Sequence, residues 1–161
     1  MTPTLTNFLA CLKTLGVSPA YDYAASAYVN NAPSSPSITI PAKHDSVGHL
    51  KVYDDGDELT VELGELHHAH FSAYNYDAET GEQRLLSATE DAAKFVADIL
   101  DDRVFISIDY SAERCIGSSH GYLDSASQPT DLVRLPDAPL FHNECTRSER
   151  YVWSGPIDIE T

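Results

Sequence analysis

The sequence predicts an α+β domain in which an antiparallel β-sheet carries helices on one face. Alternating apolar residues around an Asp-Gly pair indicate a β-meander over residues 48–75, and similar runs indicate further strands within 103–122 and 150–158. Apolar residues at helical spacing indicate an N-terminal helix and a central helix over 88–101. The chain of 161 residues shows no repeat or linker, so we expect one domain spanning 1–161.

The segment HLKVYDDGDELTVEL gives the clearest local signal for a hairpin. The Asp-Gly pair at 55–56 predicts a two-residue turn, because both central residues of such a turn need positive φ. In that register Val52 faces Leu59 and Leu50 faces Val61. All four apolar side chains then share one face of the sheet.

A third strand follows at 67–72, where small or apolar residues alternate with histidine and serine. A three-residue connection over 64–66 places Ala69 opposite Val61 and keeps the inner face apolar. His68 then lies beside Glu62 on the outer face, and His67 has the parity of the inner face.

Both helices show signals at their ends. Apolar spacing indicates the first helix over 4–15, and Gly16 follows it as a stop. The central helix has capping-box spacing from Ser87 to Glu90 and an amphipathic pattern that packs it on the inner face of the sheet. In this pattern Asp98 faces water.

The connecting segments are rich in turn-forming residues. We expect a loop at 30–36 (NNAPSSP) and a turn at 77–82 (DAETGE). SITI at 37–40 reads as a short strand between the first loop and the meander. Residues 124–149 show little periodicity and form a long irregular segment of a kind that often carries function.

The charge is strongly negative and unevenly distributed. The net charge is −15, and residues 45–109 hold sixteen of the 25 acids and only four of the ten bases. Such a field repels nucleic acid and anionic lipid and attracts basic proteins. Acidity that merely maintains solubility explains the same composition.

Targeting signals are not evident in the sequence. No window approaches the roughly 18 apolar residues of a membrane span, and the N-terminus lacks the pattern of a secretory signal. Cys11, Cys115 and Cys145 are far apart and odd in number, which suits a reducing compartment. We therefore expect a cytoplasmic protein that contacts neither membrane nor nucleic acid.

Two functions of different classes fit these features. The first is a small acidic binding protein, for example of the immunity type that neutralises a basic toxin, and it needs no cofactor. Its candidate contacts are acids of the hairpin and central helix together with aromatic anchors. They are Asp54, Asp55, Glu58, Glu62, Asp91, Asp98, Asp101, Tyr53, Tyr74 and Phe141.

The second is a zinc-dependent hydrolase. In the predicted register His49, Glu62 and His68 form one row across three strands, and two imidazoles with a carboxylate can hold Zn²⁺ with an open position. The same row is also expected from favourable cross-strand pairs on an exposed face, or from a pH-responsive binding surface. A domain with an unknown ligand is the remaining alternative.

Two further motifs contain candidate nucleophiles. GSSHG at 117–121 matches G-x-S-x-G around Ser119, but no apolar helical stripe follows it, so a glycine-bearing strand is favoured and no catalytic residue is assigned. His142 and Cys145 are close in sequence, yet cysteine proteases bring their histidine from elsewhere in the fold.

Overall fold

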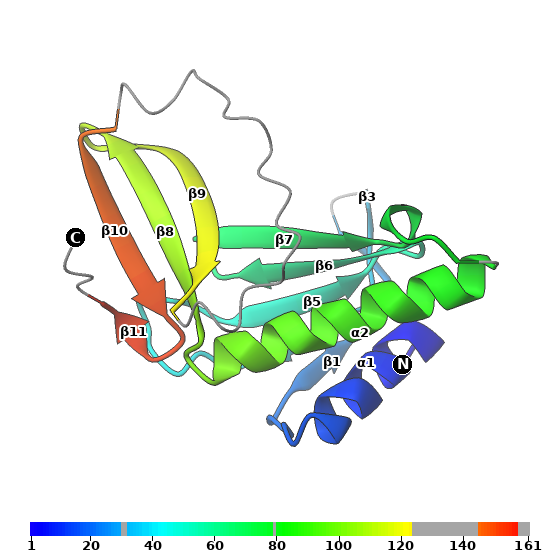
Figure 1. The fold of residues 1–161 in the computed structure, drawn as a ribbon. Helices are drawn as coiled ribbons and strands as arrows, with labels where there is room; N and C mark the ends of the chain where they lie inside the picture. The colour runs from blue at the N-terminus through cyan, green and yellow to red at the C-terminus, as the bar shows by residue number, and fades with distance from the viewer. Residues whose placement is uncertain (30–31, 79, 124–144, 158–161) are drawn as a thin grey trace.

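The described part of the chain, residues 1–29, 32–78, 80–123 and 145–157, forms two larger antiparallel sheets and two α-helices in a computed structural model (Figure 1). The helices are α1 (Pro3–Thr14), the short 3₁₀ helix η1 (Ala73–Asn75) and α2 (Gly81–Leu100). The strands are β1 (Asp22–Ala24), β2 (Ala27–Val29), β3 (Ala32–Ser34), β4 (Ser37–Ile40), β5 (Leu50–Asp54), β6 (Glu58–Leu63), β7 (His67–Ser72), β8 (Val104–Ser111), β9 (Arg114–Tyr122), β10 (Arg147–Val152) and β11 (Gly155–Pro156).

The two sheets share one helical layer. The first sheet has the order β1-β4-β5-β6-β7 and the second the order β11-β10-β8-β9, while β2 and β3 form a separate pair. Helix α2 runs along the first sheet and contacts β6, β7 and β8, and α1 packs against α2 (Figure 1). The predicted α+β class with helices packed on an antiparallel sheet is confirmed.

The core lies between α2 and the inner faces of the sheets. Strands β5 and β6 bury every second residue, as the alternating pattern predicts. The largest fully buried side chains come from α1, α2, four strands and the connection between β4 and β5. They are Phe8, Leu5, Leu12, Ile38, Leu50, Leu59, Ile99, Ile106, Val47, Val52, Val61 and Val96.

The hairpin register differs from the prediction by two residues. Val52 pairs with Val61 rather than with Leu59, and Leu50 pairs with Leu63. The Asp55 amide donates to the Glu58 carbonyl at 2.9 Å, so the turn is centred on 56–57 instead of 55–56. A shift by two residues preserves parity, and the inner face therefore stays apolar.

The next connection confirms the predicted register. Val61 pairs with Ala69, Glu62 with His68 and Leu63 with His67, around a three-residue connection at 64–66. The inner-face parity of His67 is therefore also confirmed.

The predicted start of the central helix was wrong. Helix α2 begins at Gly81, with Thr80 as its N-cap. The Thr80 side chain accepts from the Gln83 amide at 3.2 Å, and the Gln83 side chain accepts from the Thr80 amide at 3.2 Å. This capping box satisfies two donors at the helix start, so Ser87 lies inside the helix rather than at its end.

The remaining elements agree in part with those predicted from the sequence. The loop expected at 30–36 contains strand β3, which pairs with β2. Strands β8 and β9 form the antiparallel pair expected within 103–122, and β10 and β11 supply the terminal strands. Residues 124–144 of the expected irregular segment lie outside the described residues. Within the residues described, no helix combines the length and apolar character needed to cross a bilayer.

Candidate functional site

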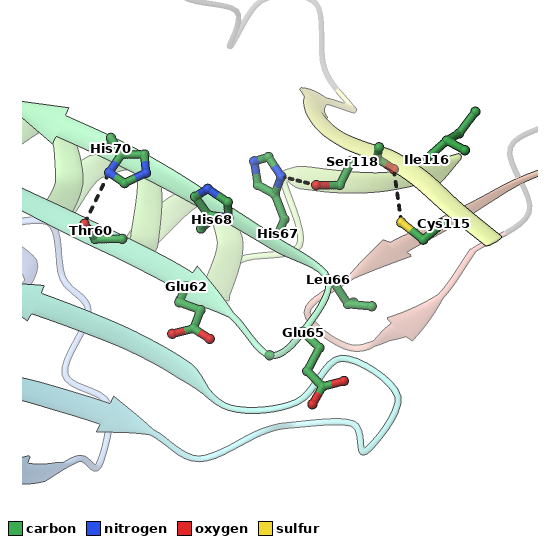
Figure 2. Close-up of a pocket in the computed structure, with 12 residues that line it drawn as sticks. Thr60, Glu62, Glu65, Leu66, His67, His68, His70, Cys115, Ile116 and Ser118 are labelled. Atoms are coloured by element: carbon green, nitrogen blue, oxygen red, sulfur yellow. Dashed lines mark hydrogen bonds between the residues drawn. The ribbon is translucent and has the colours of Figure 1, made fainter. Parts of the chain in front are cut away.

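An open groove lies where the two sheets meet. Strands β7 and β9 are the end strands of their sheets, and they flank a hollow of about 600 Å³ that we call the inter-sheet groove (Figure 2). Its lining residues come from β6, β7, β9 and the connections at their ends. They are Thr60, Glu62, Gly64, Glu65, Leu66, His67, His68, His70, Cys115, Ile116, Gly117 and Ser118.

His67 reaches from the first sheet to the second. Its Nδ1 lies 2.9 Å from Ser118 Oγ, and its Nε2 lies 2.9 Å from His120 Nδ1 (Figure 2 shows the first of these contacts). His67 is the first residue of β7 and has inner-face parity, so its ring points past the end of the first sheet toward β9. One side chain therefore links the two sheets.

The backbone before His67 is held by a close glycine contact. Gly64 has a φ of +52°, and a Cβ built on it would lie 2.3 Å from the Val47 carbonyl oxygen. The Gly64 amide donates to the His49 carbonyl at 2.9 Å. Only glycine fits this position without displacing the backbone, and the tight connection sets where β7 begins.

Ser118 and His120 lie two residues apart on one face of β9, opposite Ile108 and Ile106 of β8. The His120 ring packs against Phe95 of α2 with centroids 4.9 Å apart. Ser118 is exposed to the groove, whereas His120 is partly buried. The packing thus fixes the His120 ring and leaves the serine hydroxyl accessible.

Burial keeps both linked imidazoles neutral. Burial, followed by the neighbouring His120 and His68 rings, lowers the pKa of His67 from 6.5 to about 4. Burial also lowers the pKa of His120. A neutral ring has one donor and one acceptor nitrogen. The contacts are satisfied when Ser118 donates to His67 Nδ1 and His67 Nε2–H donates to His120 Nδ1.

The outer-face histidines have different surroundings. His70 Nδ1 lies 2.6 Å from Glu58 Oε1 and 3.3 Å from Thr60 Oγ1. The rings of His68 and His70 meet edge to face with centroids 5.1 Å apart. Both histidines are exposed, so the contacts of His70 with Glu58 and Thr60 are cross-strand contacts on a solvated face, and the contact between the two rings lies within β7.

The shifted hairpin register changes the row proposed for zinc. Glu62 pairs with His68 on one side, as predicted, but on the other side it pairs with Lys51 instead of facing His49. His49 precedes β5, and its Nδ1 accepts from the Ala42 amide at 2.9 Å. Across residues 1–29, 32–78, 80–123 and 145–157, no three His, Cys, Asp or Glu side chains form a group that could hold a metal ion.

Two acids expected to contact a partner are buried. Asp98 is 1% exposed, which corrects the prediction that it faces water. Its carboxylate accepts from Lys94 Nζ and Arg103 Nη2, both at 2.7 Å, and these charges compensate for its burial. Asp54 is 8% exposed and accepts from Thr2 Oγ1 and from the Gly56 amide.

Other predicted contacts gather at one end of the molecule. We define the acidic end as the β5–β6 turn residues Asp55, Asp57 and Glu58 together with Tyr74 and Glu82. Tyr74 is 76% exposed, and its hydroxyl donates to Asp57 Oδ2 at 3.0 Å. Tyr74, Asp57 and Glu82 border a hollow of about 440 Å³ that also contains Arg84.

The other predicted contacts are dispersed. Asp91 is exposed and accepts from the Tyr76 hydroxyl at 2.6 Å, and exposed Asp101 pairs with Arg103 at 3.3 Å. Tyr53 is partly buried, and burial followed by the nearby Glu62 raises its pKa to about 12. Phe141 lies outside the described residues.

The serine motif lies in a strand, as the sequence analysis favoured. Residues 117–121 belong to β9, where Ser119 pairs with Ser107 on the face opposite Ser118. Cys145 Sγ lies 3.5 Å from Ser148 Oγ, and His142 is outside the described residues.

Sequence reasoning missed the grouping of His67, Ser118 and His120. Its one signal was the inner-face parity of His67 at a strand end.

No family model, curated protein or solved structure matches this chain.

Proposed function

We propose that this protein binds a basic protein partner through its acidic end, as an immunity-type protein does when it neutralises a cationic toxin. The observation that carries the proposal is Tyr74, a 76% exposed aromatic side chain that is hydrogen-bonded to Asp57 within a group of acids. Tyrosine supplies a large contact area at low entropic cost, and it is enriched at the centres of protein interfaces. The surrounding carboxylates suit lysine and arginine side chains.

The charge of the whole chain supports the same partner class. A net charge of −15 steers a cationic protein toward the surface and can raise association rates by about 10 to 1,000-fold. The same field opposes contact with nucleic acid and anionic membranes, and the proposed setting is the cytoplasm. Arg84 beside Tyr74 adds one positive charge at the acidic end, so the partner should also present an acceptor there.

The test neutralises the three turn acids of the acidic end with amides of nearly the same shape and leaves Glu82 in place. The partner is sought first among basic proteins encoded beside this gene, and association is followed by surface plasmon resonance. Asp55→Asn, Asp57→Asn and Glu58→Gln combined should slow association about tenfold at low salt and reduce its salt dependence. Tyr74→Ala should weaken affinity mainly through faster dissociation, by about 1 to 2 kcal/mol.

A matched control neutralises three exposed acids elsewhere. Asp22→Asn, Asp45→Asn and Glu113→Gln together make the same change in net charge away from the acidic end. This variant should lose much less association rate than the acidic-end variant. Equal losses in both variants would show that overall charge, rather than this surface, drives binding. Failure of Tyr74→Ala to weaken binding would exclude Tyr74 as the anchor.

A further inference from the structure

We propose that Ser118 is the nucleophile of a small esterase-type site in the inter-sheet groove, with His67 as its base and His120 as the residue that positions His67. The proposed substrates are small esters of neutral or cationic groups. This site lies apart from the acidic end and does not depend on partner binding.

The geometry supplies the three parts that a hydroxyl nucleophile needs. Ser118 Oγ is exposed to a groove of about 600 Å³ and lies 2.9 Å from His67 Nδ1, within range for direct proton transfer. His67 Nε2 lies 2.9 Å from His120 Nδ1, so the base is oriented by a third group. The His120 ring is itself held against Phe95.

The protonation state of the base also fits. Because burial lowers the pKa of His67 to about 4, its imidazole is neutral at neutral pH and holds a free lone pair at Nδ1 for the serine proton, although the same low pKa makes it a weaker base than free histidine. The titratable groups that face it are His120 on β9 and His68 on its own strand, and Phe95 of α2 behind His120 is uncharged. His120 accepts from Nε2–H at 2.9 Å and so holds the His67 ring with Nδ1 directed at Ser118.

The chemical step balances with water as the only co-reactant. Ser118 Oγ forms a bond to the ester carbonyl carbon while its proton moves to His67 Nδ1. The tetrahedral intermediate then collapses, the bond to the alcohol oxygen breaks, and His67 returns the proton to that leaving oxygen. Water attacks the acyl-serine by the same route in reverse, which releases the carboxylic acid and restores the Ser118 hydroxyl.

The free edge of β9 offers donors for the carbonyl oxygen. Among the described strands β9 ends its sheet and pairs only with β8. Alternate backbone N–H groups of such an edge strand point away from the strand that it pairs with, and residues 115–118 of β9 line the groove. Donors of this type stabilise the negative oxygen of a tetrahedral intermediate.

The charge of the groove restricts its substrates. Glu62 and Glu65 line it and project below the histidines in Figure 2. Their carboxylates repel an anionic acyl or alcohol group and tolerate a neutral or cationic one. The site should therefore hydrolyse p-nitrophenyl acetate faster than the corresponding ester of succinic acid.

The first experiment labels the nucleophile in the full-length protein. An alkyl fluorophosphonate forms a phosphorus–oxygen bond with an activated serine and loses fluoride, and peptide mass spectrometry locates the adduct. We expect an adduct on Ser118 that is absent from Ser118→Ala and retained in Ser119→Ala, which changes the opposite face of the same strand. An unlabelled wild-type protein, or equal labelling of Ser118→Ala at another residue, would refute the proposal.

The second experiment measures hydrolysis of p-nitrophenyl acetate in a Cys115→Ala background, because the exposed Cys115 thiol in the groove can react with such esters. Ser118→Ala and His67→Gln should each lower kcat by about 100-fold or more, and Ser119→Ala should leave it unchanged. His120→Gln should lower kcat with little change in KM, since His120 acts through His67. Activity lost on chelation, or unaffected by Ser118→Ala, would contradict the serine assignment.

Discussion

The histidines of this chain differ in what surrounds them, and burial separates their roles. His67 and His120 are partly buried and linked to each other at 2.9 Å, whereas His68 and His70 lie on the solvated face of the same region. Burial penalises the charged imidazolium, so the linked pair stays neutral over a wider pH range than free histidine. The same chemical group thus serves as an inter-sheet link in one place and as a surface residue in another.

This difference predicts a loss of stability in mild acid. The pKa of His67 falls from 6.5 to about 4 on folding, so between these values the unfolded chain binds more protons than the folded chain. The free energy of unfolding should therefore decrease as the pH falls from 6.5 toward 4. His67→Gln should make this decrease smaller, and urea denaturation at a series of pH values measures it.

His68→Gln is the matched control for that experiment, because it removes an exposed histidine from the adjacent position. Its stability should stay close to the wild-type pH dependence, because burial lowers the pKa of His67 more than the His68 ring does. If His67→Gln and His68→Gln gave the same curve, the buried link between the sheets would not be the source of the acid sensitivity.

At the scale of the element, α2 shows how two similar capping signals compete. Both Thr80 and Ser87 have a glutamine or glutamate three residues later. The helix begins at the earlier one, and the seven additional residues lengthen its contact with η1 and the sheet. The buried residues of α2 begin at Ala88, whereas residues 81–87 are exposed or partly buried, so the start of the helix depends on the cap more than on core packing.

The two signals can be separated by mutation. Thr80→Ala should lower the free energy of unfolding by about 1 kcal/mol, because it removes the side chain that caps α2. Ser87→Ala should change it by at most about 0.5 kcal/mol, with stabilisation expected, because alanine is the better residue inside a helix. Thermal unfolding of the two variants measures both changes. A larger loss for Ser87→Ala would mean that the helix starts there in solution.

The β5–β6 hairpin shows which part of a register the pattern determines. The alternation of apolar and polar residues determines which side chains face the core. The inner face was therefore predicted correctly, and it carries Leu50, Val52, Leu59 and Val61. Alternation cannot distinguish registers that differ by two residues, because both give the same faces. Local hydrogen bonds in the turn favour the observed register: the Asp54 side chain accepts from the Gly56 amide at 3.1 Å.

At the scale of the whole molecule, the main electrostatic feature is the excess of negative charge. The chain carries 25 acids against ten bases, and repulsion among them opposes the compact state. Added salt screens charges that are farther apart than the Debye length, which is about 10 Å at 0.1 M. The pairs that the buried Asp98 carboxylate makes with the partly exposed Lys94 and Arg103 are less affected.

We therefore expect salt to stabilise the fold. Raising NaCl from about 10 mM to about 200 mM should increase the free energy of unfolding in urea, because it screens the excess negative charge. Urea is uncharged and leaves the ionic strength under control. The variant with three neutralised residues at the acidic end should respond less. A decrease with salt would indicate that attractive surface pairs outweigh the net repulsion.

The sequence by itself determined the meander and the two helices, their inner faces and the sign of the electrostatic field, but not the short strands β1 to β3 or the start of α2. Periodicity, turn residues and composition are local properties, and they identified the meander, the two helices and the register of β7 on β6. Only the tertiary structure decided which side chains meet between elements. It separated His49 from Glu62, buried Asp98 and brought Ser118 to His67, residues 51 positions apart. Such meetings depend on how two sheets pack on one helix, and no local pattern encodes that angle.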